Sequence, residues 1–232
     1  MNAVFFDGDQ TLWDFDAVMR RSIGETLEEL RKHRPGRVPD DLAVEALVVD
    51  RDVAAGAFAP GEADMVRIRR AGFARTLRRI GLEDDGLADH LTDFYLEHRF
   101  TGVLPYPDVL PCLRALSATF ALGLLSNGNS YPERCGLDGV FEVVVFAQDH
   151  GFAKPDRRLF DAASARIANT PDALFMVGDS MAKDVAGAQG AGWRGIWLNR
   201  DHAARPDGPE PDATITSLSE LPEALGVLVA QG

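Results

Sequence analysis

Two aspartates, two residues apart, follow an apolar segment near the start of the sequence. Val4-Phe5-Phe6 leads directly into Asp7-Gly8-Asp9. An apolar run of this kind predicts a strand buried on both faces, so the two carboxylates should emerge at the strand's end. Gly8 would let the backbone turn closely around whatever lies between them. We interpret the pair as functional carboxylates, although an ordinary turn uses the same residue types.

Three later segments place polar residues in the same position relative to a strand. Strands are predicted over 120–125, 143–146 and 174–177, and each is followed by a polar loop. The carboxyl ends of parallel strands meet at one edge of a sheet, where ligands bind. The residues expected there are Asp7, Asp9, Ser126, Asn127, Lys154, Asp179 and Asp184.

Four aspartates in one crevice would repel one another strongly. Two like charges about 4 Å apart cost on the order of 4 kcal/mol at an effective dielectric near 20. Lys154 alone cannot offset that repulsion, which implies a bound divalent cation. Oxygen-only ligands favour a hard ion, and a few carboxylates with water and phosphate describe Mg²⁺ better than Ca²⁺ or Zn²⁺.

Lys154 and Ser126 suit a phosphate ligand. The chain has only three lysines, against many arginines, and a compact ammonium fits a site where it meets a phosphoryl oxygen and a carboxylate. Ser126 precedes a potential nest of backbone amides, which binds phosphate oxygens. A solvated lysine and a local serine turn are the alternative interpretations.

Strands that alternate with helices predict an α/β fold with a Rossmann-like parallel sheet, and a run of helices after the first strand predicts an inserted helical domain. Further strands are expected over 195–198 and 213–215, with helices between them, and right-handed crossovers would cover both faces of the sheet. Ser217 and Glu220 have the spacing of a capping box. The core domain is expected over 1–13 and 105–232.

The segment 14–104 is expected to form a small helical bundle. The first helix should end at His33, and the second should run from Asp40, as its cap, to about residue 55. The third should span about 62–80, and the fourth should carry Leu87 to Tyr95. In the third helix, we expect Val66, Phe73, Leu77 and Ile80 to form the apolar stripe, with Arg69 and the other arginines facing solvent.

The net charge and cysteine content indicate which kinds of ligand and compartment to expect. The 232 residues carry a formal net charge of -12 with a pI near 4.8, which disfavours nucleic acid as a ligand. A small anionic ligand held by local positive charge is expected instead. Cys112 and Cys135 lie in unrelated segments, and neither a leader nor a membrane span is evident, so we expect a cytoplasmic protein in a reducing compartment.

The four polar segments resemble, in order, the motifs of the haloacid dehalogenase-like (HAD) hydrolase superfamily. They are Asp7-Gly8-Asp9-Gln10-Thr11-Leu12, Leu125-Ser126-Asn127, Lys154-Pro155, and Gly178-Asp179-Ser180 through Asp184. The resemblance covers essentially the whole chain, and the helical insert is similar to that family's small α-helical cap.

The resemblance implies a role for each matched residue. Asp7 would attack phosphorus and form an aspartyl-phosphate, and Asp9 would protonate the leaving alcohol and then activate water. Lys154 would neutralise the nucleophile and the phosphate. The implied phosphate-binding residues are Gly8, Thr11, Ser126, Asn127 and Lys154. The implied Mg²⁺ ligands are Asp7, Asp9 through its carbonyl, Asp179 and Asp184.

Asp9 favours a phosphatase within this superfamily. Release of a halide needs no proton, whereas release of an alkoxide does, and dehalogenating members lack an acid at that position. The stretches 176–179 and 197–200 are similar to nucleotidase-like members; phosphoglycolate and sugar phosphates stay open as substrates, as does the oligomeric state. The alternatives are a 2-haloacid dehalogenase and a non-hydrolytic phospho-accepting receiver module.

Overall fold

A six-stranded parallel sheet organises the larger unit of the computed structural model, which describes residues 1–58, 64–168 and 171–231. The strands occur in the sheet order β3-β2-β1-β4-β5-β6, and every neighbouring pair is parallel. Their bounds are β1 Asn2–Phe6, β2 Phe120–Ser126, β3 Val143–Phe146, β4 Leu174–Gly178, β5 Arg194–Leu198 and β6 Ala213–Ile215. The predicted α/β fold class is confirmed.

β1 lies at the point where the strand order reverses. It pairs with β2 on one side, with Phe6 opposite Leu124, and with β4 on the other, with Phe6 opposite Val177. Ligands bind beside such a switch point in open α/β sheets. The loops that follow β1, β2 and β4 are therefore neighbours at the carboxyl edge.

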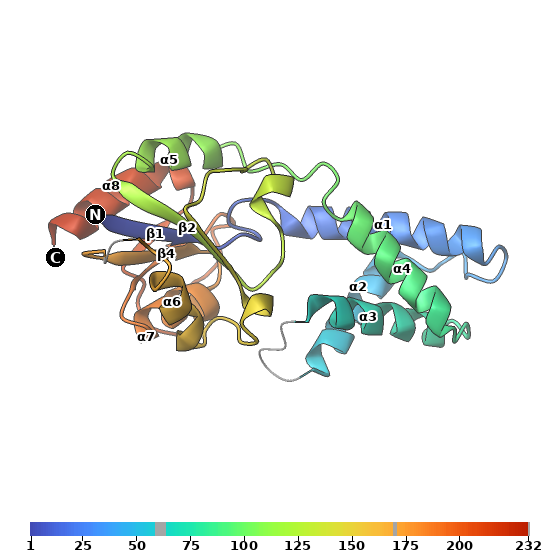
Figure 1. Ribbon diagram of the computed structural model, residues 1–232. Coiled ribbons are helices and arrows are strands. Elements are labelled where there is room, and N and C mark those ends of the chain that lie inside the picture. The colour runs from blue at the N-terminus through green and yellow to red at the C-terminus, as the bar shows by residue number, and fades with distance from the viewer. Residues whose placement is uncertain (59–63, 169–170, 232) are drawn as a thin grey trace. The chain divides into compact units, whose positions relative to one another are not determined.

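Helices cover both faces of this sheet (Figure 1). α5 (Val109–Leu116) packs with α8 (Leu221–Ala230) on one face, and α6 (Arg157–Ser164) packs with α7 (Ala186–Gly190) on the other. Val4, Phe5 and Phe6 are consequently fully buried, which explains why β1 is apolar without alternation. The capping box predicted at Ser217 and Glu220 is formed, and it begins the turn η4 (Leu218–Glu220) before α8.

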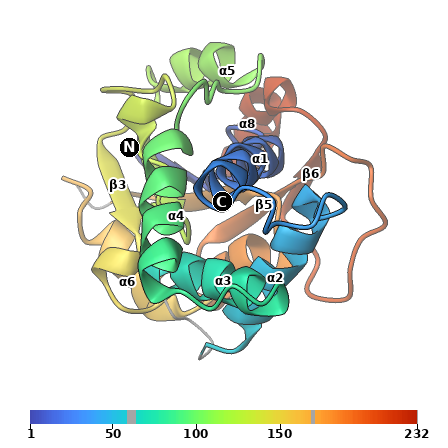
Figure 2. The same cartoon turned by 90° about the vertical axis from the view of Figure 1, so that its right-hand side faces the viewer.

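The chain divides into two compact units, one of Met1–Asp14 with Val103–Gly232 and one of Phe15–Gly102. The second unit contains α1 (Phe15–His33), α2 (Val44–Gly56), α3 (Met65–Arg79) and α4 (Asp85–His98). α2 packs on α3, α3 on α4, and α4 on α1 (Figure 2). Side chains such as Leu27, Leu47, Leu77 and Leu91 form its apolar core.

Two helix starts in this unit differ from the expected ones. Asp40 is not a cap: the N–H of Leu42 bonds to Pro39 O in a turn, and α2 begins only at Val44 without a side-chain cap. The expected start of the third helix at Glu62 lies outside the described residues. α3 starts at Met65, where Asp64 accepts a hydrogen bond from the Arg67 N–H at 3.0 Å.

The apolar stripe predicted for α3 is also wrong at two positions. Val66 is 48% exposed, whereas Arg69 is only 6% exposed. A Cβ on Gly72 would come within 3.1 Å of the Arg51 backbone, so α2 and α3 approach closely on the face that carries Arg69. The Arg69 guanidinium lies 5.7 Å from the Tyr95 ring centroid. Burial, followed by the charge of Arg99, lowers the pKa of Arg69 to about 10.

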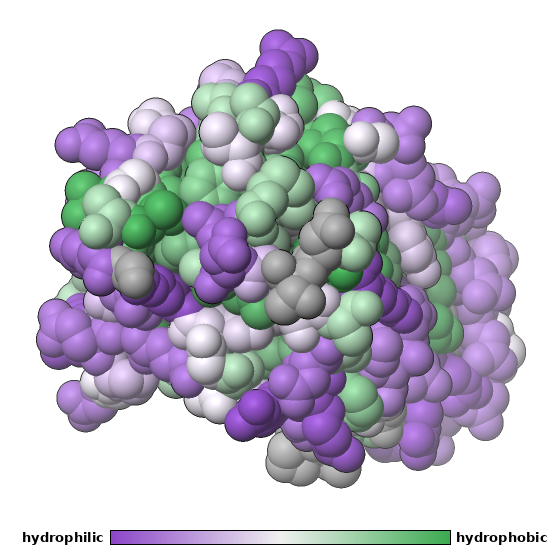
Figure 3. All heavy atoms as spheres, turned by 60° about the vertical axis from the view of Figure 1, so that its left-hand side comes forward, coloured by the Kyte–Doolittle hydropathy of each residue, from purple (hydrophilic) through white to green (hydrophobic). Residues whose placement is uncertain are grey.

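Hydrophilic residues cover much of the face drawn in Figure 3, and apolar residues lie among them in small groups. Scattered apolar surface of this kind is usual for a folded chain in water. A bilayer-crossing helix needs about 20 predominantly apolar residues. Over the described ranges, none of the helices satisfies that requirement.

Candidate active site

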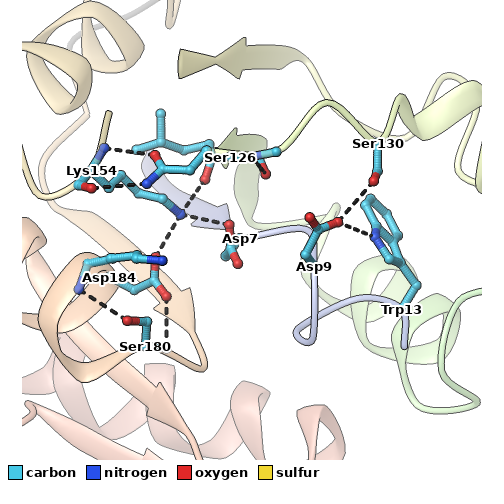
Figure 4. Close-up of polar contacts among 12 residues, drawn as sticks. Asp7, Asp9, Trp13, Ser126, Ser130, Lys154, Ser180 and Asp184 are labelled. Atoms are coloured by element: carbon cyan, nitrogen blue, oxygen red, sulfur yellow. Dashed lines mark hydrogen bonds and ion pairs between the residues drawn. The ribbon is translucent and has the colours of Figure 1, made fainter. Parts of the chain in front are cut away.

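The carboxyl edge of the sheet brings together Asp7 and Lys154, which are far apart in the sequence. The Asp7 N–H continues the β1–β4 ladder by donating to Val177 O at 2.9 Å, and this hydrogen bond fixes the residue at the strand tip. Lys154 Nζ lies 2.7 Å from Asp7 Oδ1. The lysine side chain is 1% exposed and the aspartate side chain 13%. A buried ion pair therefore occupies the centre of the edge (Figure 4).

The ammonium group of Lys154 uses all three of its donors. Besides Asp7, it donates to Leu125 O and to Asp184 Oδ1, each at 2.7 Å. Its loop is held by Asn127, which accepts from the Lys154 N–H at 2.8 Å and donates to Lys154 O at 3.0 Å. Burial opposes the charged form, but the charges of Asp184 and Asp7 outweigh it and raise the pKa of Lys154. The lysine is thus a fixed cation at neutral pH.

Asp184 is buried behind the tip of β4. It belongs to the π-helical turn η3 (Met181–Val185), and its Oδ2 accepts from the Ser180 N–H at 3.0 Å. Its carboxyl group occupies the space that a side chain at Gly178 would need, so glycine is required at the end of β4. These contacts fix the orientation of the carboxylate toward Lys154.

Asp179 completes a group of three carboxylates with Asp7 and Asp184. One oxygen of each lies within 4.8 Å of the others. The Trp197 indole holds the Asp179 backbone by donating to its carbonyl at 2.9 Å. Burial raises the pKa of Asp7 to about 7, with Lys154 lowering it and Asp184 raising it. Although Asp179 is an exposed residue, desolvation of its carboxyl, followed by the charge of Asp184, raises its pKa to about 6.

This donor set fits a hard divalent cation. All three donors are carboxylate oxygens within 4.8 Å of one another, and opposite oxygens around Mg²⁺ are separated by about 4 Å, so rotation of the side chains could bring the three oxygens around one ion. Burial and the charge of Asp184 raise the pKa values of Asp7 and Asp179, and the charge of Lys154 offsets these effects only in part. A divalent cation at this point would supply further positive charge.

The carboxyl group of Asp9 turns away from this group, toward Trp13 and Ser130 (Figure 4). Its Oδ1 accepts from the Trp13 indole N–H at 2.8 Å and from the Ser130 hydroxyl at 2.9 Å. Its Oδ2 lies beside Gly128, where a Cβ would come within 2.5 Å of it. The two hydrogen bonds therefore orient Asp9 at the rim of the edge, beside the strand tip that carries Asp7.

The remaining expected residues have differing environments. Ser126 is buried at the end of β2, and its Oγ accepts from the Gly128 N–H at 3.1 Å. Thr11 is fully buried, and its carbonyl accepts from Arg200 at 3.0 Å. A Cβ on Gly8 would come within 2.8 Å of the Trp13 ring. Ser126 thus contributes to a polar loop, while Thr11 and Gly8 shape the backbone after β1.

Several supporting residues were missed by reasoning from the sequence. Trp13, Ser130 and Trp197 are not among the site residues expected from the sequence. Trp13 and Ser130 hold Asp9, and Trp197 holds the Asp179 loop. The only available signal was the apolar-polar character of tryptophan, whose buried N–H needs an acceptor.

The chain matches one family model and is similar to proteins of known activity. The family model described as haloacid dehalogenase-like hydrolase matches residues 1–192. The chain is 28% identical over 236 residues to pyrimidine 5'-nucleotidase YjjG of Escherichia coli, with 96% of each chain covered. It is 33% identical over 166 residues to phosphoserine phosphatase of Thermus thermophilus, covering 68% of this chain and 66% of that one.

A solved structure adds a further likeness. The 2-haloacid dehalogenase from Pseudomonas syringae pv. Tomato DC3000 superposes with a TM-score of 0.79 at 32% identity. The match covers 98% of this chain and 99% of that one. Proteins named for different activities therefore share this fold, so the activity has to be argued from the residues of the site.

Proposed function

The chain belongs to the haloacid dehalogenase-like hydrolases, and from this premise we propose that it is a Mg²⁺-dependent phosphatase of small phosphomonoesters. Residues 1–13 and 105–232 would form the catalytic core, with 14–104 as the cap. The observation that carries the proposal is the buried cation of Lys154, shared between Asp7 and Asp184. Its charge counteracts the effect of burial on the Asp7 pKa and so favours the ionised carboxylate that a nucleophile requires.

In the first step, an Asp7 oxygen forms a bond to phosphorus as the bond from phosphorus to the ester oxygen breaks. The departing alkoxide takes a proton from Asp9, which must rotate away from Trp13 and Ser130 to deliver it. Products of this half-reaction are the alcohol and an aspartyl-phosphate on Asp7. Lys154 neutralises Asp7 before attack and the phosphorylated side chain afterwards.

In the second step, water attacks the same phosphorus. Asp9, now a carboxylate, accepts a proton from the water as the new bond forms. The bond between phosphorus and Asp7 breaks, which releases orthophosphate and restores the Asp7 carboxylate. Splitting one displacement into two is the purpose of a covalent nucleophile.

Asp7, Asp179, Asp184 and the Asp9 carbonyl would hold Mg²⁺, which would supply positive charge that stabilises the phosphoryl group. The phosphoryl group would be held by Gly8, Ser126 and Asn127, with Lys154 beside them and Thr11 steadying the loop. Asn127 also anchors the backbone of Lys154, which couples the phosphate site to the buried cation.

A 2-haloacid dehalogenase is the second candidate, because a dehalogenase is among the similar structures. Asp9 favours the phosphatase. Two hydrogen bonds accepted by its Oδ1 orient this carboxyl group, which supports a role in proton transfer that a halide leaving group would not need. A nucleoside 5'-monophosphate is the first substrate to test, given the nucleotidase relative.

The test is a parallel assay of the purified chain with Mg²⁺. Release of orthophosphate would be measured over nucleoside monophosphates, phosphoserine, phosphoglycolate and sugar phosphates, and release of chloride from 2-chloropropionate. We expect orthophosphate release that is absent in Asp7→Asn, and no chloride release. Chloride release without phosphatase activity would replace the proposal by the dehalogenase. A stable phospho-Asp7 without turnover would indicate a receiver module.

A further inference from the structure

A second cluster of metal-ligand side chains lies in the helical unit. It consists of Glu29 and His33 from α1 and His90 from α4. One ligand atom of each lies within 4.8 Å of the others. Glu29 and His33 are four residues apart, which places them on one face of α1, one turn from each other. The cluster joins two helices that pack together.

From this cluster we infer that Glu29, His33 and His90 bind a divalent transition-metal ion of the zinc type. This site is separate from the proposed Mg²⁺ site and does not depend on the phosphatase proposal. Two imidazoles and one carboxylate are a donor set that binds Zn²⁺. Imidazole nitrogen selects against Mg²⁺, which prefers oxygen.

The distances within the cluster suit one ion. His33 Nε2 lies 3.2 Å and His90 Nε2 3.3 Å from the same oxygen, Oε1 of Glu29. Ligands at about 2.0–2.1 Å from a tetrahedral ion are separated from each other by about 3.3–3.4 Å. The two rings lie with their centroids 4.3 Å apart, inclined at 47°. Small side-chain rotations would therefore place all three ligand atoms around a single ion.

Accessibility also favours binding. His33 and His90 side chains are each 41% exposed, while Glu29 is 16% exposed. An ion can therefore enter from solvent and retain water as a further ligand, while the carboxylate stays partly shielded. The net charge of -12 raises the local concentration of cations.

Two cations flank the cluster without occupying its shared oxygen. Lys32 Nζ lies 3.4 Å from Oε2 of Glu29, the oxygen that the histidines do not use. The guanidinium of Arg34 is paired with Asp84 at 2.6 Å. Neither contact has to break for an ion to bind at Oε1.

The competing explanation is a hydrogen-bonded cluster in which the two imidazoles donate to Glu29. The distances of 3.2 and 3.3 Å fit such hydrogen bonds as well. The two explanations differ in whether the cluster retains Zn²⁺, so metal binding decides between them. In the metal-bound form, both nitrogens must be deprotonated and act as ligands.

The experiment is a Zn²⁺ titration of the full chain, free of any histidine tag, by calorimetry in excess Mg²⁺. The variants are Glu29→Gln, His33→Gln and His90→Gln, and Asp179→Asn reports on zinc in the proposed Mg²⁺ site. The matched control is His98→Gln, because His98 lies on α4 with its ring stacked on Phe94, outside the cluster. Circular dichroism would verify that each variant is folded.

We expect the wild type to bind one Zn²⁺ per chain, and His98→Gln and Asp179→Asn to bind it equally well. Each variant of the cluster should weaken its binding by more than about tenfold, since losing a direct ligand costs at least as much as losing a ligand's supporting residue. Zn²⁺ should also raise the Tm of the wild type and not that of the cluster variants. Equal Zn²⁺ binding by the wild type and a His33→Gln/His90→Gln double variant, or binding lost only in Asp179→Asn, would overturn the inference.

Discussion

Lys154 Nζ lies 2.7 Å from Oδ1 of Asp7 and at the same distance from Oδ1 of Asp184, so one buried ammonium joins the first motif to the last. Asp7 comes from the end of β1 and Asp184 from the turn after β4. The lysine is therefore a structural link between two carboxylates as well as a group beside the nucleophile. Its removal should affect stability as well as activity.

We predict that Lys154→Met destabilises the fold by about 3–5 kcal/mol near pH 8, because it leaves two crowded carboxylates without their cation. The loss should be smaller at pH 5, where the raised pKa of Asp7 lets that group protonate readily. Urea unfolding of the wild type and the variant at both pH values measures this loss of stability. The reverse trend, or a loss below about 1 kcal/mol, would contradict a stabilising ion pair.

Asp9→Asn should separate the two proton transfers. With p-nitrophenyl phosphate, whose leaving group needs little protonation, we expect a burst of about one equivalent of p-nitrophenolate and then slow turnover. With an alkyl phosphate the first step itself should slow by about 10²–10⁴-fold. Rapid mixing measures both, and Asp7→Asn serves as the control that gives no burst. Unchanged steady-state rates in Asp9→Asn would remove Asp9 from the mechanism.

Removal of divalent cations should abolish orthophosphate release, and Mg²⁺ should restore it. Mg²⁺ should also raise the Tm of the wild type, because it relieves the repulsion among Asp7, Asp179 and Asp184. Asp179→Asn should lose most of this rise while remaining folded, since the residue is exposed. Asp161→Asn, an exposed aspartate on α6, is the matched control. An equal rise in all three proteins would place the ion elsewhere.

Gly178→Ala should destabilise the core by about 1–3 kcal/mol and lower activity, because the added methyl group overlaps the Asp184 carboxyl. Gly190→Ala in α7 is the matched comparison. No atom lies within 4 Å of a Cβ there, and alanine suits a helix better, so we expect no loss or a gain of a few tenths of a kcal/mol. Chemical denaturation of both variants tests the pair, and equal losses would refute the overlap.

Asp108 should make stability depend on acid pH. Burial alone would raise its pKa, but hydrogen bonds from Arg200, Ser217 and the Leu218 N–H outweigh it and lower the pKa below the usual value. A depressed carboxyl pKa stabilises the fold above the unfolded value of about 3.9, and this contribution disappears as pH falls through the folded pKa.

Asp108→Asn should therefore cost about 1–2 kcal/mol at pH 7, a value below that of a fully buried pair because the side chain is 16% exposed. The cost should shrink toward pH 3.5. Urea unfolding at the two pH values provides the measurement. A cost that stays the same at both would show that the negative charge of Asp108 is not what stabilises this contact.

The strands and their polar tips could be predicted because burial on both faces requires continuous apolar runs. Val4-Phe5-Phe6 and Leu174-Phe175-Met176-Val177 are such runs; Asp7 directly follows the first, and Gly178 and Asp179 follow the second. The convergence of the residues that follow the strands comes from the general rule that ligands bind at the carboxyl edge of a parallel sheet.

Contacts between side chains from separate segments could not be predicted. Asp9 and Trp13 are four residues apart, yet nothing local shows that the indole and Ser130 would hold the carboxyl group. Arg69 was assigned to solvent by residue type alone, while the close approach of α2 at Gly72 buries it. Asp40 has the residue type of a cap, but Pro39 begins a turn there instead.

The central position of β1 also bears on how the chain acquires its shape during synthesis. β1 is translated before both of its sheet neighbours, residues 120–126 and 174–178, and the whole helical segment 15–102 is made in between. On the ribosome this apolar strand must wait without a partner while that segment emerges. A nascent chain stalled before residue 174 should thus be recognised by chaperones that bind exposed β1, whereas one extended past β4 should escape them.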